Sequence, residues 1–121
     1  MADSISNQKR ILITGATGKL GSALFARFSK INECIPLSYT NSTENGFNLD
    51  LTDELAVDKL FDQVQPDIII HTAALTDVDF CEENPEQAYN LNVLATKNII
   101  KWISEKSENT KIIYISTDHI Y

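Results

Sequence analysis

The chain has 121 residues, of which 43% are hydrophobic and 22% are charged. This composition is typical of a folded globular domain, and the length provides one hydrophobic core, which excludes a cofactor domain followed by a separate substrate domain. Asp and Glu number 17 against 10 Lys and Arg, giving a net charge of -7, and the basic residues are scattered. A surface that neutralises the phosphates of a nucleic acid is therefore not expected.

No segment has the features of a membrane span or a signal peptide. Apolar runs such as residues 68–70 are far shorter than a bilayer is thick, and the polar first ten residues lack an apolar core. We expect a cytoplasmic protein without membrane contact, with a disordered polar leader over residues 1–8. Cys34 and Cys81 lie outside any metal-ligand or redox spacing, so neither a disulfide framework nor a metal site is expected.

In the first half of the chain, short apolar runs alternate with a helical pattern. Residues 9–14 predict a buried strand, residues 18–30 an amphipathic helix, residues 33–38 a second strand and residues 47–51 a brief third one. The loop before that third strand is rich in Asn, Ser and Thr. The buried face of the helix is predicted to carry Leu20, Ala23, Leu24, Phe28 and Ile31.

The second half continues the alternation. Thr52 is the predicted N-cap of a helix that ends before Pro66, and residues 67–72 and 111–116 predict two further strands. Asn84 and Pro85 predict the start of a long helix that runs to about residue 105. The buried faces of these two helices are predicted to carry Leu55, Leu60, Phe61 and Val64 in the first, and Ala88, Leu91, Ala95, Ile99, Trp102 and Ile103 in the second.

Apolar strands that alternate with helices are typical of the α/β class. They predict a doubly wound parallel sheet of the Rossmann type, with about five strands and helices on both faces. Ligands of such sheets bind at the carboxyl ends of the strands, where the strand order reverses.

A glycine motif lies between the first predicted strand and the first predicted helix. Gly15, Gly18 and Gly21 are three of the four glycines in the chain. In this context Gly15 permits a sharp turn, Gly18 lets a pyrophosphate approach the backbone, and Gly21 lets the helix pack closely. The free N–H groups of the helix N-terminus then face the anion.

The spacing GxxGxxG, preceded by Thr14, resembles the opening signature of the extended branch of the short-chain dehydrogenase/reductase superfamily. Residues 48–51 (NLDL), 71–74 (HTAA) and 115–121 (ISTDHIY) resemble three further motifs of that superfamily. Within it, the chain is similar to the dTDP-4-dehydrorhamnose reductases and to the regulatory beta subunits of methionine adenosyltransferase. Residues 9–121 are thus expected to be the N-terminal part of an NAD(P)-binding Rossmann-type domain, ending before the C-terminal substrate lobe.

The resemblance implies roles for individual residues. In the family, the Asp of the motif matched by residues 48–51 contacts adenine, and the motif matched by residues 71–74 lines the middle of the cofactor. A Ser or Thr after the fifth strand binds the substrate carbonyl. The implied cofactor-binding residues are Gly15, Thr17, Gly18, Lys19, Leu20, Gly21, Asp50, Leu51, Thr72, Ala73, Ala74 and Ser116. The implied catalytic residues are Thr117 and Asn92, the latter as the helix asparagine that supports the active-site water and lysine.

The family's catalytic Tyr-x-x-x-Lys pair is not present in this sequence, because no Tyr is followed by Lys four positions later. We therefore expect no turnover from these 121 residues alone. We also expect weak or no dinucleotide binding, because much of the nicotinamide side and the sheet edge after the fifth strand are missing. His71 is expected to be a hydrogen-bonded packing residue, and the acidic residues from Asp77 to Glu83 a solvated loop.

For a parent protein, the resemblance implies an NAD(P)-dependent reductase of a nucleotide-activated 4-keto-6-deoxy sugar, with a nucleotide-sugar substrate and a homodimeric state. NADPH is expected in preference to NADH, since residues 38–41 offer no carboxylate for a ribose hydroxyl. The alternatives are a dinucleotide-binding regulatory subunit without turnover, or a nucleotide-sugar epimerase or dehydratase.

Overall fold

The computed structural model describes residues 8–16, 18–38, 46–72 and 83–115, and in them five parallel strands form one sheet in the order β3-β2-β1-β4-β5. The strands are β1 (Arg10–Thr14), β2 (Glu33–Ser38), β3 (Phe47–Asn48), β4 (Ile68–His71) and β5 (Lys111–Tyr114). The helices are α2 (Lys19–Phe28), α3 (Glu54–Val64) and α5 (Pro85–Lys106). The predicted doubly wound α/β fold is confirmed.

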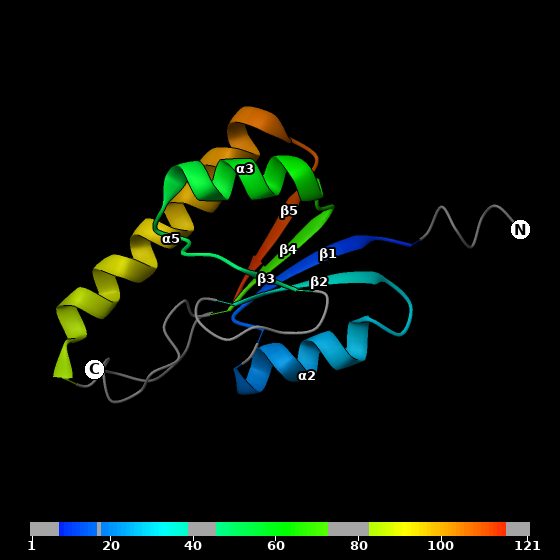
Figure 1. Cartoon of the computed structure of the whole chain (residues 1–121), viewed down its shortest axis with the longest axis horizontal. Coiled ribbons are helices and arrows are strands. Elements are labelled where there is room, and N and C mark those ends of the chain that lie inside the picture. Colours follow the sequence, from blue (N-terminus) through cyan, green and yellow to red (C-terminus); the bar gives the residue numbers. More distant parts are fainter. Residues whose placement is uncertain (1–7, 17, 39–45, 73–82, 116–121) are drawn as a thin grey trace, which may run out of the picture.

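The strand order reverses between β1 and β4. The chain moves outward from β1 through β2 to β3, then returns to the other side of β1 for β4 and β5. Helix α2 covers one face of the sheet, and α3 and α5 lie together on the other (Figure 1). The turn that follows β1 therefore lies at the switch point, where sheets of this kind bind ligands.

Side chains that alternate along the strands supply the two faces of the core. Leu12 and Ile69 belong to the cluster that contains Phe61 of α3 and Trp102 of α5. On the opposite face, Ile11, Ile13 and Ile70 form a smaller cluster, against which Leu24, Phe25 and Phe28 of α2 pack.

Helices α3 and α5 are joined by an aromatic contact and a shared carboxylate. The rings of Phe61 and Trp102 meet edge to face, with centroids 5.4 Å apart and an interplanar angle of 81°. Trp102 Nε1 donates to Asp62 Oδ1 at 2.9 Å, and Lys106 Nζ lies 3.0 Å from Asp62 Oδ2. The hydrogen bonds from Trp102 and Lys106 lower the pKa of Asp62.

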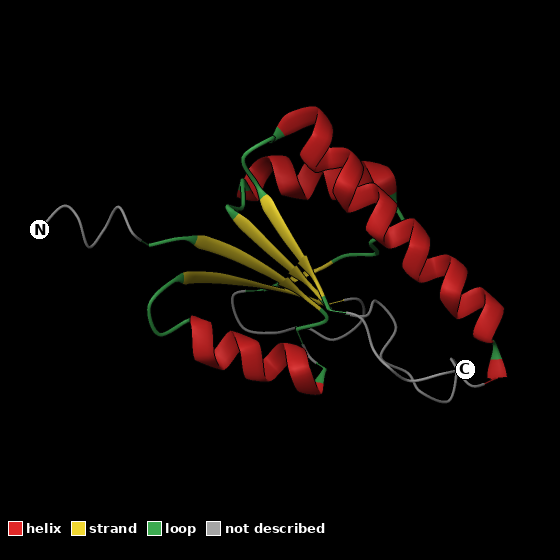
Figure 2. Cartoon of the chain, turned by 180° about the vertical axis from the view of Figure 1, so that it is seen from behind, coloured by secondary structure: helices red, strands yellow, loops and turns green. Residues whose placement is uncertain are grey.

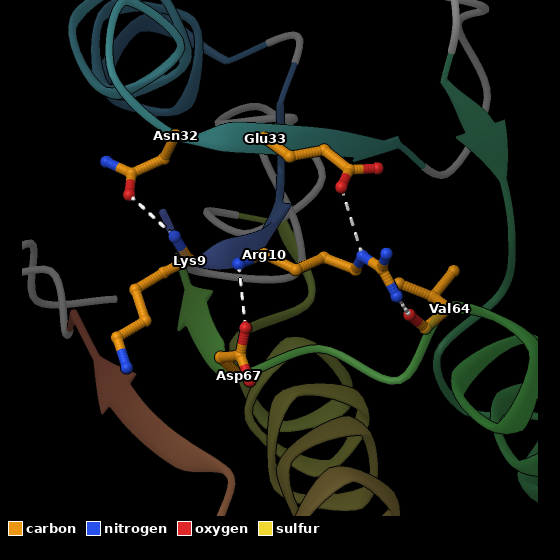
Figure 3. Close-up of polar contacts among 6 residues, drawn as sticks. All are labelled: Lys9, Arg10, Asn32, Glu33, Val64 and Asp67. Atoms are coloured by element: carbon orange, nitrogen blue, oxygen red, sulfur yellow. Dashed lines mark hydrogen bonds and ion pairs between the residues drawn. The ribbon is translucent and has the colours of Figure 1, made fainter. Parts of the chain in front are cut away.

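Arg10 links three elements at the amino ends of the strands (Figure 3). Its backbone N–H donates to Asp67 Oδ2 at 2.9 Å, its Nε lies 3.2 Å from Glu33 Oε1, and its Nη1 donates to the carbonyl of Val64 at 2.8 Å. That carbonyl belongs to the last turn of α3, where a cation also complements the helix dipole. These contacts fix the edge of the sheet opposite the carboxyl ends.

Some residues of the predicted buried faces of α2 and α3 are exposed, although Leu24 and Phe28 of α2 pack against the core as predicted. Leu20 is 47% exposed, Ile31 76% and Leu55 79%, and Ala23 is also exposed, so their predicted burial was wrong. In α2 the line of contact follows Gly21, Leu24, Phe25 and Phe28. Leu20 and Ala23 lie well to the sides of that line at about 100° per residue, and Ile31 lies beyond the helix end.

In α3 the predicted Leu60, Phe61 and Val64 are buried, together with Val57. Leu55 stands two positions before Val57, about 200° around the helix axis, and therefore faces away from the core. In α5, Ala95, Ile99 and Trp102 are buried as predicted, and Ile103 packs against the same cluster.

The predicted cap of α3 was displaced by one residue. Asp53 is the N-cap, with its side chain accepting from Ala56 N at 3.2 Å. The hydroxyl and backbone N–H of Thr52 instead donate to Asp50 Oδ1, at 2.6 and 2.9 Å. This local turn is formed by Asp50 and shortens β3 to two residues rather than the five predicted.

The last strand is less buried than its apolar sequence predicts. Ile113 is 51% exposed and Tyr114 is 48% exposed. Strand β5 pairs with β4 and is the terminal strand in the sheet order, so it lacks a neighbour on its other side in the described part of the chain.

Candidate functional site

The turn after β1 requires glycine at its first position. Gly15 has a φ of 65°, and among the described residues it is the one glycine with a positive φ. A side chain there would strain the backbone. The Gly18 N–H donates to the Gly15 carbonyl at 3.0 Å, and the Ala16 N–H donates to the Leu37 carbonyl of β2 at 3.1 Å. The predicted sharp turn is present.

Gly21 lies directly against this turn. A Cβ atom on Gly21 would stand 2.0 Å from the carbonyl oxygen of Gly15 and 2.7 Å from its carbonyl carbon. These are backbone atoms, which cannot rotate away as a flexible side chain can. The close packing expected at Gly21 therefore occurs between α2 and the turn itself. Seen from behind, α2 lies on the side of the sheet opposite the other two described helices (Figure 2).

The N-terminus of α2 has no acid in its first turn, and its N-cap, Gly18, makes no side-chain capping bond. The first N–H bonded within the helix is that of Ser22, which donates to the Gly18 carbonyl at 2.9 Å. By helix geometry, the amides of Lys19, Leu20 and Gly21 have no partner inside the helix.

The other two described helices differ. Helix α3 has a carboxylate cap and an acid in its first turn, and α5 has an acid in its first turn. The positive end of the α2 dipole thus has no carboxylate nearby in its own first turn, an arrangement that favours an anionic ligand.

Behind this turn, the carboxyl ends of β1 and β4 are joined by buried polar groups. Thr14 and His71 are register partners, and Thr14 Oγ1 lies 2.7 Å from His71 Nδ1. The Thr72 N–H donates to Thr14 Oγ1 at 3.2 Å, and the Thr72 hydroxyl donates to the Thr14 carbonyl at 2.8 Å. All three residues are buried.

The second ring nitrogen of His71 contacts α5. His71 Nε2 lies 3.2 Å from Thr96 Oγ1, and the Thr96 hydroxyl donates to the Asn92 carbonyl at 2.9 Å. Burial lowers the pKa of His71 to about 4, so the ring is neutral at physiological pH. It also packs against Tyr114 of β5, with ring centroids 5.3 Å apart. The expectation of a hydrogen-bonded packing histidine is met.

The two expected residues after β3 face different surroundings. Asp50 is exposed, with Oδ1 accepting from Thr52. Leu51 is buried in the larger core cluster, and its carbonyl accepts from Asn98 Nδ2 at 2.9 Å. At the end of β2, the buried Ser38 donates its hydroxyl to Asn48 Oδ1 at 3.0 Å.

The structure brings part of the expected set together. Gly15, Gly18, Lys19, Leu20 and Gly21 form the turn and the helix start; Thr72 lies beside them through Thr14, and Asn92 is connected through His71 and Thr96. Thr17, Ala73, Ala74, Ser116 and Thr117 lie outside the described residues, as do Asp77, Asp79 and Cys81. The functional roles of all these residues remain predictions.

The sequence analysis gave Thr14 no role beyond opening the glycine motif and did not single out Thr96 or Asn98, although all three bear on the site. One signal existed for each. Thr14 is a polar residue that ends an otherwise apolar strand, while Thr96 and Asn98 are polar residues adjacent to the apolar stripe of α5. A buried polar side chain requires a hydrogen-bond partner, and the partners became visible only in the folded chain.

A parallel, doubly wound sheet with a glycine turn and an acid-free helix N-terminus at its switch point defines the class of dinucleotide-binding α/β domains. Residues 9–121 match the family model described as the RmlD substrate binding domain. The chain belongs to this family, within the extended short-chain dehydrogenases/reductases.

Among curated proteins, the chain is similar to the methionine adenosyltransferase 2 subunit beta of Xenopus laevis, with 36% identity over 114 residues, or 93% of this chain and 34% of that protein. It is also similar to the crystal structure of a hypothetical dTDP-4-dehydrorhamnose reductase from Sulfolobus tokodaii. The TM-score is 0.79 and the identity 38%, over 93% of this chain and 40% of that one. The chain thus spans about a third of the curated relatives it matches.

Structural relatives of the chain bind NAD or NADP. The dTDP-4-dehydrorhamnose reductase of Bacillus anthracis, with a TM-score of 0.71 and 30% identity over 94% of this chain and 38% of that one, was solved in complex with NADP. A UDP-glucose 4-epimerase from Thermus thermophilus, with a TM-score of 0.71 and 26% identity over 85% of this chain and 36% of that one, was solved with NAD. Among the helices that the structure describes, none is both long enough and apolar enough to cross a bilayer.

Proposed function

We propose that the turn after β1 and the first turn of α2 bind the diphosphate of an NAD(P) dinucleotide. One observation carries this proposal: an acid-free helix N-terminus rests, through Gly21, on a left-handed glycine turn at the switch point. The amides of Lys19, Leu20 and Gly21 would donate to the diphosphate, and the helix dipole would favour its charge.

For a whole protein that contains this chain, we propose an NAD(P)H-dependent reductase of a nucleotide-activated 4-keto-6-deoxy sugar. Thr117 would hydrogen-bond the substrate carbonyl, Asn92 would support the active site from α5, and NADPH is the preferred donor because residues 38–41 contain no acid. A Tyr and a Lys outside these 121 residues would complete the proton transfer. We also propose that the whole protein is a homodimer.

A second candidate is a regulatory subunit that binds a dinucleotide without turnover. It is supported by the 36% identity to a methionine adenosyltransferase beta subunit, which is close to the 38% identity to a reductase. Reduction of a dTDP-4-keto-6-deoxy sugar by the whole protein would favour the first candidate. Absence of that activity, together with co-purification of a methionine adenosyltransferase catalytic subunit, would favour the second. A nucleotide-sugar epimerase or dehydratase is the third candidate, and it predicts conversion without net consumption of NADPH.

The diphosphate site is tested by calorimetric titration of the whole protein with NADPH and NADH, using the Gly18→Val variant. Gly18 has a φ of -73° and a ψ of 170°, an extended conformation that any residue adopts, so the backbone should tolerate the change. The new side chain stands where the diphosphate must approach, and binding should fall at least tenfold. Ala26→Val, on the exposed side of α2, is the control. Equal affinities of Gly18→Val and Ala26→Val would overturn the proposal.

A further inference from the structure

The shortest hydrogen bonds around His71 favour one direction of donation. Thr96 Oγ1 has one proton and two possible acceptors, the Asn92 carbonyl at 2.9 Å and His71 Nε2 at 3.2 Å. The shorter contact assigns the proton to the carbonyl, so Thr96 Oγ1 accepts from His71 Nε2. The proton of a neutral imidazole must then be on Nε2. The other nitrogen, Nδ1, is left as an acceptor for the Thr14 hydroxyl at 2.7 Å.

The same direction holds on the other side of the ring. Thr14 Oγ1 accepts from the Thr72 N–H at 3.2 Å, and its own proton has two acceptors within reach, His71 Nδ1 at 2.7 Å and the Thr72 carbonyl at 3.4 Å. The shorter contact assigns that proton to His71 Nδ1. A continuous chain of donors thus runs from the backbone of Thr72, through Thr14, His71 and Thr96, to the backbone carbonyl of Asn92. Each link is buried or half-buried, and in such surroundings an unpaired polar group is costly.

The two ends of this row of hydrogen bonds lie near different parts of the proposed site. Thr14 directly precedes Gly15, whose turn supports the start of α2, while Asn92 and Thr96 are one turn apart on α5. Strand pairing fixes β1 relative to β4, but α5 is joined to neither strand by backbone ladders. The imidazole bridges that gap with a rigid ring.

We propose that His71, as the neutral tautomer protonated at Nε2, is a positioning residue that sets the place of the Asn92 turn of α5 relative to the glycine turn. Its effect on ligand affinity rests on the proposed dinucleotide site, whereas the tautomer and the position of α5 do not. Glutamine or phenylalanine would fill similar space, but neither offers one acceptor and one donor on opposite sides of a flat ring.

The first measurement is long-range ¹H–¹⁵N correlation spectroscopy of the histidine side chains in the labelled 121-residue chain at pH 7. We expect His71 to show an unprotonated Nδ1 and a protonated Nε2. A proton on Nδ1, or exchange between the two tautomers, would overturn the proposal. This result depends neither on a variant that folds nor on a bound dinucleotide.

The second measurement compares Thr96→Val, which removes the acceptor for Nε2, with Thr96→Ser, which retains it. Thr110→Val is the matched control, because Thr110 is also a buried threonine whose hydroxyl donates to a backbone carbonyl, that of Pro66, at 2.7 Å. We expect Thr96→Val, but not Thr110→Val, to alter the His71 ring signals and the amide shifts of Thr14 and Gly15. Thr96→Ser should restore both.

In the whole protein, Thr96→Val should weaken NADPH binding about fivefold, the fold-change that corresponds to one net hydrogen bond. If Thr96→Val and Thr110→Val change the ring signals, the amide shifts and the affinity equally, His71 is only a packing residue and the proposal fails. If the unmodified protein binds no dinucleotide while Thr96→Val still shifts Thr14 and Gly15, the proposed function fails and the positioning role stands.

Discussion

Acidification should destabilise this domain through His71 before its carboxylates are protonated. The folded-state pKa of His71 is about 4, against an ordinary value of 6.5, because the ring is buried. Above pH 6.5 the ring is neutral in both the folded and unfolded states. Between pH 6.5 and 4 only the unfolded chain binds the proton, so the free energy of unfolding falls as the pH falls.

The size of this loss follows from the difference between the two pKa values. About 2.5 pKa units at 1.4 kcal/mol each correspond to about 3 kcal/mol in the free energy of unfolding. This stabilisation is fully present above pH 6.5 and fully lost below pH 4. The assay is urea unfolding of the unmodified chain and of His71→Gln at several pH values from 7.5 to 4. His119 is present in both proteins, so its contribution largely cancels in the comparison.

The unmodified chain should lose about 3 kcal/mol more than His71→Gln across this range. The lowered pKa of Asp62 acts in another window, because its stabilisation is lost only as the pH falls through its folded-state value, below 3.8. Parallel pH profiles of the two proteins would refute the assignment of a buried, neutral His71.

Three further changes test other parts of the structure, each measured by urea denaturation. Gly21→Ala should lower the free energy of unfolding by about 3 kcal/mol or more, because its Cβ would stand 2.0 Å from a backbone atom. A loss no greater than that of Ala23→Val, on the exposed side of α2, would contradict the close packing. Asp53→Ala should cost about 1 kcal/mol through loss of the α3 cap, and no change would mean that another group caps this helix. Trp102→Phe should lower the free energy of unfolding by about 1–2 kcal/mol, because it removes the hydrogen bond to Asp62. It should also raise the pKa of Asp62 in an NMR titration. An unchanged pKa would show that the indole does not hydrogen-bond the carboxylate.

The strand and helix order was predictable because each apolar run is bounded by residues that end it. Strand β2 has the predicted bounds, and Asn84 and Pro85 mark the start of α5 as expected. A parallel sheet follows from strands that are apolar on both faces and separated by helices. The glycine turn was predictable for the same reason, since Gly15 and Gly21 occupy positions where a side chain is excluded by strain or by contact.

The errors have local physical causes. Leu20 and Leu55 are apolar residues whose angle around the helix could be assigned only once the line of contact with the core was known. Thr52 and Asp53 are both competent caps, and the choice between them was made by Asp50, which bonds Thr52.

The polar network could not be predicted from the sequence because its members are far apart in the chain. His71 is 57 residues from Thr14 and 25 from Thr96. Only the register of β1 with β4, and the packing of α5 over them, bring these three side chains together.

The proposed diphosphate site is tested by amide chemical shifts of the whole protein during titration with NADPH. The amides of Lys19, Leu20 and Gly21 should shift together, with one dissociation constant that matches calorimetry, and Gly18→Val should move the midpoint of these shifts to an at least tenfold higher NADPH concentration. Saturable binding of NADPH that leaves these three amides unmoved would contradict a diphosphate at the N-terminus of α2.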